Sequence, residues 1–124
     1  MIGTIMAREV SEIPEVLHRQ IQHGLDTYLL AGQQAAQTTP RGFVTCARGT
    51  SDHAATFFKY VMETRIGLPV TSIGPSIASV YKTPLKLQDL ICLTVSQSGG
   101  SPDLVALQAV AKQGGAQTLA LLNV

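Results

Sequence analysis

The chain has 124 residues, of which 14% are charged and 45% are hydrophobic, and its formal net charge is +1. This length suits one domain, at the low end of the range for an α/β fold. The composition argues against disorder, and the absence of a basic stripe argues against a nucleic-acid partner. No apolar run approaches ~18 residues and the N-terminus lacks a signal-peptide pattern, so we expect a cytoplasmic protein without membrane contact.

The cysteines and histidines give no indication of a metal site. Cys46 and Cys92 each fall within an apolar stretch that predicts a buried strand, which favours reduced core thiols and leaves a disulfide open. His18 and His23 are five residues apart on a predicted helix, off the i, i+4 spacing that places two ligands on one face. We therefore expect no metal and no cofactor.

The N-terminal part is expected to be helical. Between Ser11 and Thr38, apolar residues recur at three- and four-residue spacing, which predicts an amphipathic helix. Pro14 suits the first turn of that helix. Gly24 either divides the segment into two helices or is absorbed in one. We interpret residues 1–38 as a helical lead-in and residues 39–124 as the main domain.

The remaining chain alternates between short apolar strands and helical patterns. This alternation predicts an α/β fold with a parallel sheet, flavodoxin-like strand order 2-1-3-4-5 and helices on both faces, a three-layer sandwich. Because the last apolar stretch ends at Val124 without a following helix, we expect the domain to be truncated after its fourth strand. The strands are expected at 42–47, 70–73, 90–95 and 118–124, and the helices from near His53, from Ser76 through Tyr81 and after Pro102.

A loop rich in hydroxyls and glycines follows the third strand. It runs from Ser96 to Ser101, and Pro102 after it predicts a helix for which Ser101 is the N-cap. Helix-terminal amides lack intrahelical partners and carry the positive end of the dipole, so such a loop can hold an anion. The same composition is also ordinary turn chemistry.

A second loop repeats the arrangement after the first strand. Arg48, Gly49, Thr50 and Ser51 stand between that strand and the next helical pattern. In an open parallel sheet, ligands bind beyond the carboxyl ends of the strands where strand order reverses, so the two loops would face one crevice. Arg48 either supports an anion there or is simply solvated or ion-paired.

These two loops resemble a known family. The segments Arg48–Ser51 and Leu93–Gly99, about 45 residues apart, are similar to those of the sugar isomerase (SIS) domain. With Glu12-Ile13-Pro14 ahead of them, they resemble the first repeat in the isomerising half of glucosamine-6-phosphate synthase and its deaminase relatives. The resemblance implies a SIS fold that binds an aldose or ketose phosphate without metal. The two loops contain no lysine and neither of the nucleotide-binding motifs GxGxxG and GxxxxGK[ST]. A sugar monophosphate is therefore favoured over a nucleotide as the ligand.

The resemblance also implies site residues. The phosphate would be held by Ser96, Gln97, Ser98 and Ser101, and Ser51 would reach a sugar hydroxyl or the phosphate rim. The substrate-binding loops also include Gly49, Thr50 and Gly99. In the family a glutamate base and often a ring-opening histidine lie in the second repeat, and nothing here matches them, so the catalytic residues are unknown. Gly100 stands where the synthase has a carboxylate.

Two functions remain in view. The first is sugar-phosphate binding by the first SIS repeat of an aminosugar-phosphate isomerase or deaminase, acting as a homo-oligomer such as a dimer or paired with a second SIS repeat. The alternative is a non-catalytic sugar-phosphate sensor within a regulator. Such regulators carry a basic helix-turn-helix, for which the first 38 residues are too few and too neutral.

Overall fold

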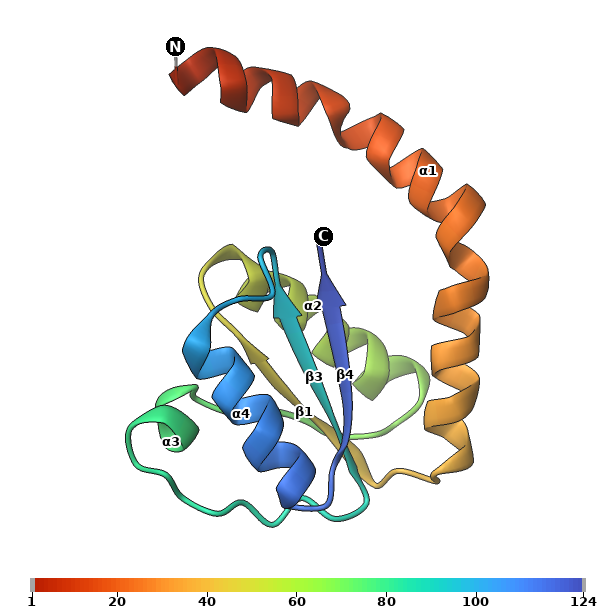
Figure 1. The fold of residues 1–124 in the computed structure, drawn as a ribbon. Coiled ribbons are helices and arrows are strands. Elements are labelled where there is room, and N and C mark those ends of the chain that lie inside the picture. The colour runs from red at the N-terminus through yellow and green to blue at the C-terminus, as the bar shows by residue number, and fades with distance from the viewer. Residues whose placement is uncertain (1, 124) are drawn as a thin grey trace. The chain divides into compact units, whose positions relative to one another are not determined.

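The computed structural model describes residues 2–123 and divides the chain into two units, one helical and one α/β. The first unit is the single helix α1 (Ile2–Gln37), with Pro14 in its interior. Our expectation that the helix begins after Ser11, with Pro14 in its first turn, is therefore wrong. A proline in a helix removes one hydrogen bond and bends the helix without necessarily ending it, and α1 is visibly curved (Figure 1). Gly24 is absorbed without a break.

The second unit is a four-stranded parallel sheet with three helices. The elements are β1 (Gly42–Ala47), α2 (Thr50–Arg65), β2 (Val70–Ser72), α3 (Ser76–Ser79), β3 (Leu90–Ser96), α4 (Pro102–Gln113) and β4 (Gln117–Leu122). The strand order is β2-β1-β3-β4, which confirms the predicted α/β class and the start of the flavodoxin-like order. β1 and β3 are the central, neighbouring strands.

Helices cover both faces of the sheet, as right-handed crossovers require. α2 lies on one face, and α3 and α4 lie on the other (Figure 1). On the α2 side, the rings of Phe43 and Phe58 pack edge to face with centroids 5.3 Å apart. On the α4 side, Cys46 packs with Leu104 and Leu107. The sheet is thus packed against helices on both faces.

Both cysteines belong to this core, as predicted. Cys46 and Cys92 are fully buried and neither forms a disulfide. Burial raises the pKa of the Cys46 thiol to about 12 and also raises the pKa of Cys92. Both groups therefore stay protonated at neutral pH and serve as small apolar side chains.

Several predicted boundaries are corrected. α2 begins at Thr50 rather than near His53, because Gly49 with φ of 59° turns the chain into the helix immediately after β1. α3 is shorter than expected and ends at Ser79. Over residues 2–123, no helix combines the length and the apolar character that crossing a bilayer requires.

β4 differs most from its prediction as a buried strand. It covers Gln117–Leu122, is half-buried at its start and exposed at its end, and Val124 lies outside the described residues. Leu121 and Leu122 are 43% and 42% exposed. The reason is position: β4 pairs only with β3 within residues 38–123, so an apolar sequence occupies a sheet edge.

Candidate functional site

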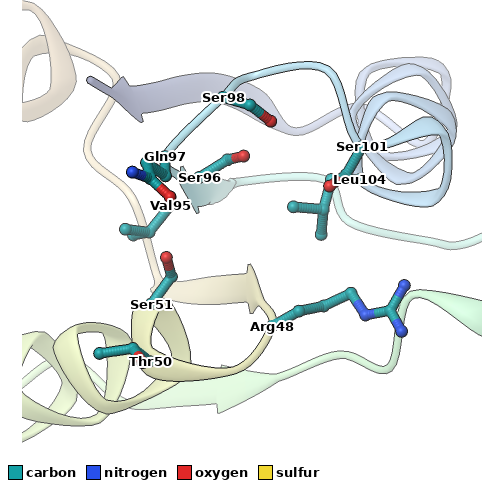
Figure 2. A pocket seen from close by; sticks show the side chains of 9 residues that line it. All are labelled: Arg48, Thr50, Ser51, Val95, Ser96, Gln97, Ser98, Ser101 and Leu104. Atoms are coloured by element: carbon teal, nitrogen blue, oxygen red, sulfur yellow. The ribbon is translucent and has the colours of Figure 1, made fainter. Parts of the chain in front are cut away.

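The two hydroxyl-bearing loops meet in one pocket at the carboxyl ends of β1 and β3. These strands are direct neighbours, with Cys46 opposite Thr94 and Ala47 opposite Val95, so the loops that follow them emerge side by side. The pocket encloses about 280 Å³, near the lower end of the roughly 300–1,000 Å³ of small-molecule sites. Its lining, drawn in Figure 2, comprises Arg48, Thr50, Ser51, Val95, Ser96, Gln97, Ser98, Ser101 and Leu104.

The loop after β3 is shaped by two of its own serines. Ser96 Oγ accepts a hydrogen bond from the Gly99 amide at 3.1 Å, and Ser98 Oγ accepts one from the Gly100 amide at 3.2 Å. Gly99 adopts φ of 70°, a left-handed conformation that glycine takes without strain. A hydroxyl that accepts a bond keeps its own O–H proton. Both serines can therefore hold the turn and still donate to a ligand.

The side-chain hydroxyls of the other two pocket serines form no hydrogen bond with the described residues. Ser101 is the N-cap residue of α4, as predicted, but its hydroxyl makes no capping bond, and Pro102 occupies the first turn. Ser51 lies in the first turn of α2 and likewise has no bonded partner among residues 2–123. In Figure 2 the hydroxyls of these two serines and of Ser96 point into a shared space. They are available to a ligand.

Two helix N-termini converge on the pocket. α2 brings Thr50 and Ser51 from its first turn, and α4 brings Ser101 and Leu104 from its own. Each terminus has amides without intrahelical partners and the positive end of a helix dipole. The site thus combines hydroxyl donors with a positive potential, the arrangement in which helix termini bind anions.

An ion pair spans the two loops at the edge of the pocket. Arg48 Nη1 donates to Asp103 Oδ2 at 2.6 Å, and the Asp103 side chain is 20% exposed against 65% for Arg48. Asp103 Oδ1 also accepts a bond from the Leu104 amide at 3.0 Å. Arg48 is the one charged side chain among the described lining residues. Its side chain points away from Ser51 (Figure 2), and its guanidinium reaches Asp103 on α4.

Most residues predicted for the site line this pocket, although their binding roles stay a prediction. Thr50, Ser51 and the four residues of the second motif, Ser96, Gln97, Ser98 and Ser101, are all in the lining. Gly49 and Gly99 are not, because they supply the positive φ angles that turn the backbone beside it.

The sequence reasoning missed Val95 and Leu104 as lining residues and the partner of Arg48. The two apolar side chains were read as core residues, and a pattern of burial cannot tell a core position from a pocket wall. Arg48 and Asp103 are 55 residues apart in sequence. Only their shared place at the carboxyl edge of the sheet could have indicated the pairing.

The side chains of the lining offer a ligand only a few kinds of chemical group. Its nine residues include no carboxylate and no imidazole. Nor do residues 2–123 bring together three or more histidine, cysteine, aspartate or glutamate side chains that could hold a metal ion. What the described chain offers a ligand is hydroxyls, an amide, backbone N–H groups and one guanidinium.

Comparison with known proteins identifies the family of the chain. Residues 41–124 match the model of the SIS domain family. The chain is similar to glutamine–fructose-6-phosphate aminotransferases (isomerizing): it is 33% identical to that of Halobacterium salinarum over 95% of the chain, and 28% identical to that of Chlorobaculum tepidum over 96%. In each case the matched part is 20% of the relative, so the chain spans about a fifth of these curated relatives.

A solved structure gives a closer match. A proposed phosphosugar isomerase from Silicibacter pomeroyi DSS-3 superimposes with a TM-score of 0.92 at 44% identity, over 96% of this chain and 36% of the other. The C-terminal domain of the glucosamine-fructose-6-phosphate aminotransferase of Francisella tularensis, at 19% identity over 75% of this chain and 26% of that one, shares the fold with a TM-score of 0.64. The matched family model, covering both loops of the pocket, shows that the chain belongs to the SIS domain family.

Proposed function

We propose that this chain binds a sugar phosphate, as the first SIS repeat of an aminosugar-phosphate isomerase or deaminase. The observation that carries the proposal is the convergence of four serine hydroxyls and two helix N-termini on one pocket. Family membership and similarity to isomerizing fructose-6-phosphate aminotransferases support a sugar phosphate as the ligand.

The chemistry of the pocket fits a phosphate monoester. Hydroxyls and backbone amides are donors, and each donor–anion bond contributes about 1.5–3 kcal/mol. Ser96 and Ser98, already oriented by the amides of Gly99 and Gly100, would donate their protons to the phosphoryl oxygens. Ser101 and the α4 terminus would complete the anion cradle, leaving Ser51, on the other loop, to reach a sugar hydroxyl or the phosphate rim.

The chain would contribute binding and orientation to the parent reaction. Moving a proton between C1 and C2 of a sugar needs a general base near neutral pKa, and the described lining has no such group. We propose that the base comes from a second SIS repeat or from another protomer. Pairing with such a repeat, or formation of a homodimer, is part of the same proposal.

The proposal is tested by ligand-dependent thermal unfolding of the purified chain. Fructose 6-phosphate or glucosamine 6-phosphate at about ten times its Kd is expected to raise the Tm by roughly 5 °C. Ser51→Ala removes a hydroxyl that has no bonded partner among the described residues, so it should weaken ligand binding about tenfold without changing the Tm of the free chain. Ser98→Ala should weaken binding and also loosen the turn at Gly100.

Ser79→Ala is the matched control for these serine variants. Ser79 lies on α3 outside the pocket, and its hydroxyl donates to the Pro75 carbonyl within its own helix. This variant should bind the ligand as the wild type does. The absence of any Tm shift at millimolar sugar phosphate, or equal binding by wild type and Ser51→Ala, would contradict the proposed site.

A further inference from the structure

The charge balance at the pocket edge is the starting point. Asp103 stands in the first turn of α4, two residues after Ser101 and directly before Leu104, both of which line the pocket. A carboxylate there occupies the positive end of the helix that an anionic ligand would also use. Left unpaired, Asp103 would repel a phosphate group held by the loop after β3.

The structure places a cation against that carboxylate. Arg48, which follows β1, reaches across to Asp103 with an Nη1–Oδ2 distance of 2.6 Å. Burial is the main reason for the raised pKa of the nearby Cys46 thiol; Asp103 adds to the rise and Arg48 opposes it, so the two charges act on this thiol in opposite directions.

We infer that Arg48 supports anion binding in this pocket by neutralising Asp103 rather than by contacting the phosphate. This inference rests on the proposed function, because it concerns how the same pocket accepts a phosphate ester. The Arg48 guanidinium is already engaged by the Asp103 carboxylate, with Nη1 bonded to Oδ2, which favours this role over direct contact. Although the Arg48 guanidinium is exposed, it can still neutralise Asp103, because Asp103 is the more enclosed member of the pair.

Calorimetric titration with fructose 6-phosphate, inorganic phosphate and neutral fructose distinguishes neutralisation of Asp103 from direct contact between Arg48 and the phosphate. Arg48→Met leaves Asp103 unpaired, so affinity for both phosphates should fall about tenfold while affinity for fructose stays unchanged. Asp103→Asn in the Arg48→Met background removes the unpaired negative charge and should restore phosphate affinity to within about twofold of wild type. Arg48→Lys retains the cation and should bind nearly as the wild type does.

The outcomes distinguish the alternatives. If Arg48 contacts the phosphate directly, or only fastens the two loops together, the double variant stays as weak as Arg48→Met, and the inference is overturned. Equal phosphate binding by Arg48→Met and wild type overturns it as well. Arg41→Met removes the same charge at the opposite end of β1 and should leave binding unchanged. If wild type binds no phosphate ester at all, the proposed function itself fails, which is a separate result.

Discussion

The four pocket serines differ in what their hydroxyl oxygens already do. Ser96 and Ser98 accept backbone N–H groups and shape the turn, whereas Ser51 and Ser101 have no bonded partner in the described structure. The Ser/Gly-rich loop after β3 therefore forms a turn and also places hydrogen-bond donors at the pocket. The two readings are compatible because a hydroxyl accepts and donates at once.

Gly114 is a position where a single methyl group should be costly. A Cβ there would lie against the carbonyl oxygen of Leu85, closer than atoms can approach. The Gly114 carbonyl also accepts the Leu87 amide at 2.9 Å, so the loop cannot move away freely. We expect Gly114→Ala to lower the free energy of unfolding by about 2 kcal/mol, measured by chemical denaturation.

Gly74→Ala provides the control for that prediction. A Cβ at Gly74 would meet only the Ser76 hydroxyl at 3.9 Å, an ordinary contact. This substitution should change stability by well under 1 kcal/mol, because it adds a methyl group in nearly open space. Comparable losses in the two variants would show that the Leu85 contact does not decide the effect.

At the scale of elements, β2 is held by a clamp from α2. Lys59 Nζ donates to Glu63 Oε1 at 2.8 Å and to the Val70 carbonyl at 2.9 Å, and the Val70 amide donates to Glu63 Oε1 at 3.3 Å. β2 has only three residues and pairs with β1 alone. Side-chain bonds to its backbone thus supply some of the pairing that such a short edge strand lacks.

The clamp makes stability depend on acid pH. The hydrogen bond from Lys59 and then the bond from the Val70 amide lower the pKa of Glu63. A carboxyl whose pKa is lower when folded contributes stability that is fully present above its unfolded pKa of about 4.3 and is lost as pH falls through the folded pKa. Urea unfolding between pH 6 and pH 3 should show this loss for wild type and a shallower decline for Glu63→Gln.

Glu15→Gln is the comparison for the acid titration. Glu15 is an exposed residue of α1 and forms none of the ion pairs found among the described residues. Its removal should leave the acid dependence as it is in wild type. A Glu63→Gln profile that overlays the wild-type profile would mean that the clamp does not stabilise the fold.

At the scale of the whole molecule, the α/β unit should open from its edges. β1 and β3 pair on both sides, whereas β2 and β4 each pair on one side, and the end of β4 is exposed. Amides of central, buried strands exchange only through the largest openings. We expect hydrogen exchange to be slowest in β1 and β3 and at least tenfold faster at Leu121 and Leu122.

The exchange experiment also reports on an interface at β4. The unpaired edge and the exposed leucines are features that a further strand or a second chain would cover. If the amides of β4 exchange as slowly as those of β3 at low protein concentration, β4 is not an open edge in solution and the prediction is wrong. If exchange of the β4 amides becomes faster on further dilution of the sample, a second copy of the chain protects this edge.

The sequence by itself determined the fold class, the parallel sheet and the two hydroxyl loops. These depend on local patterns: runs of apolar residues for strands buried on both faces, three- and four-residue spacing for helices, and Ser101-Pro102 for a helix start. The helix start predicted from Pro14 was wrong because the local preference of proline for a first turn was overridden in α1. The prediction that β4 is buried was wrong because an apolar run does not reveal whether a strand is central or at an edge.

Only the tertiary structure decided which residues meet. The adjacency of β1 and β3 brings Ser51 and Ser98 into the lining of one pocket and pairs Arg48 with Asp103 across 55 residues of sequence. It also separates Gly49 and Gly99, which turn the backbone, from the side chains that line the pocket. Local preference fixes each element, but distances between elements follow from packing helices on both faces of the sheet, which no short stretch of sequence encodes.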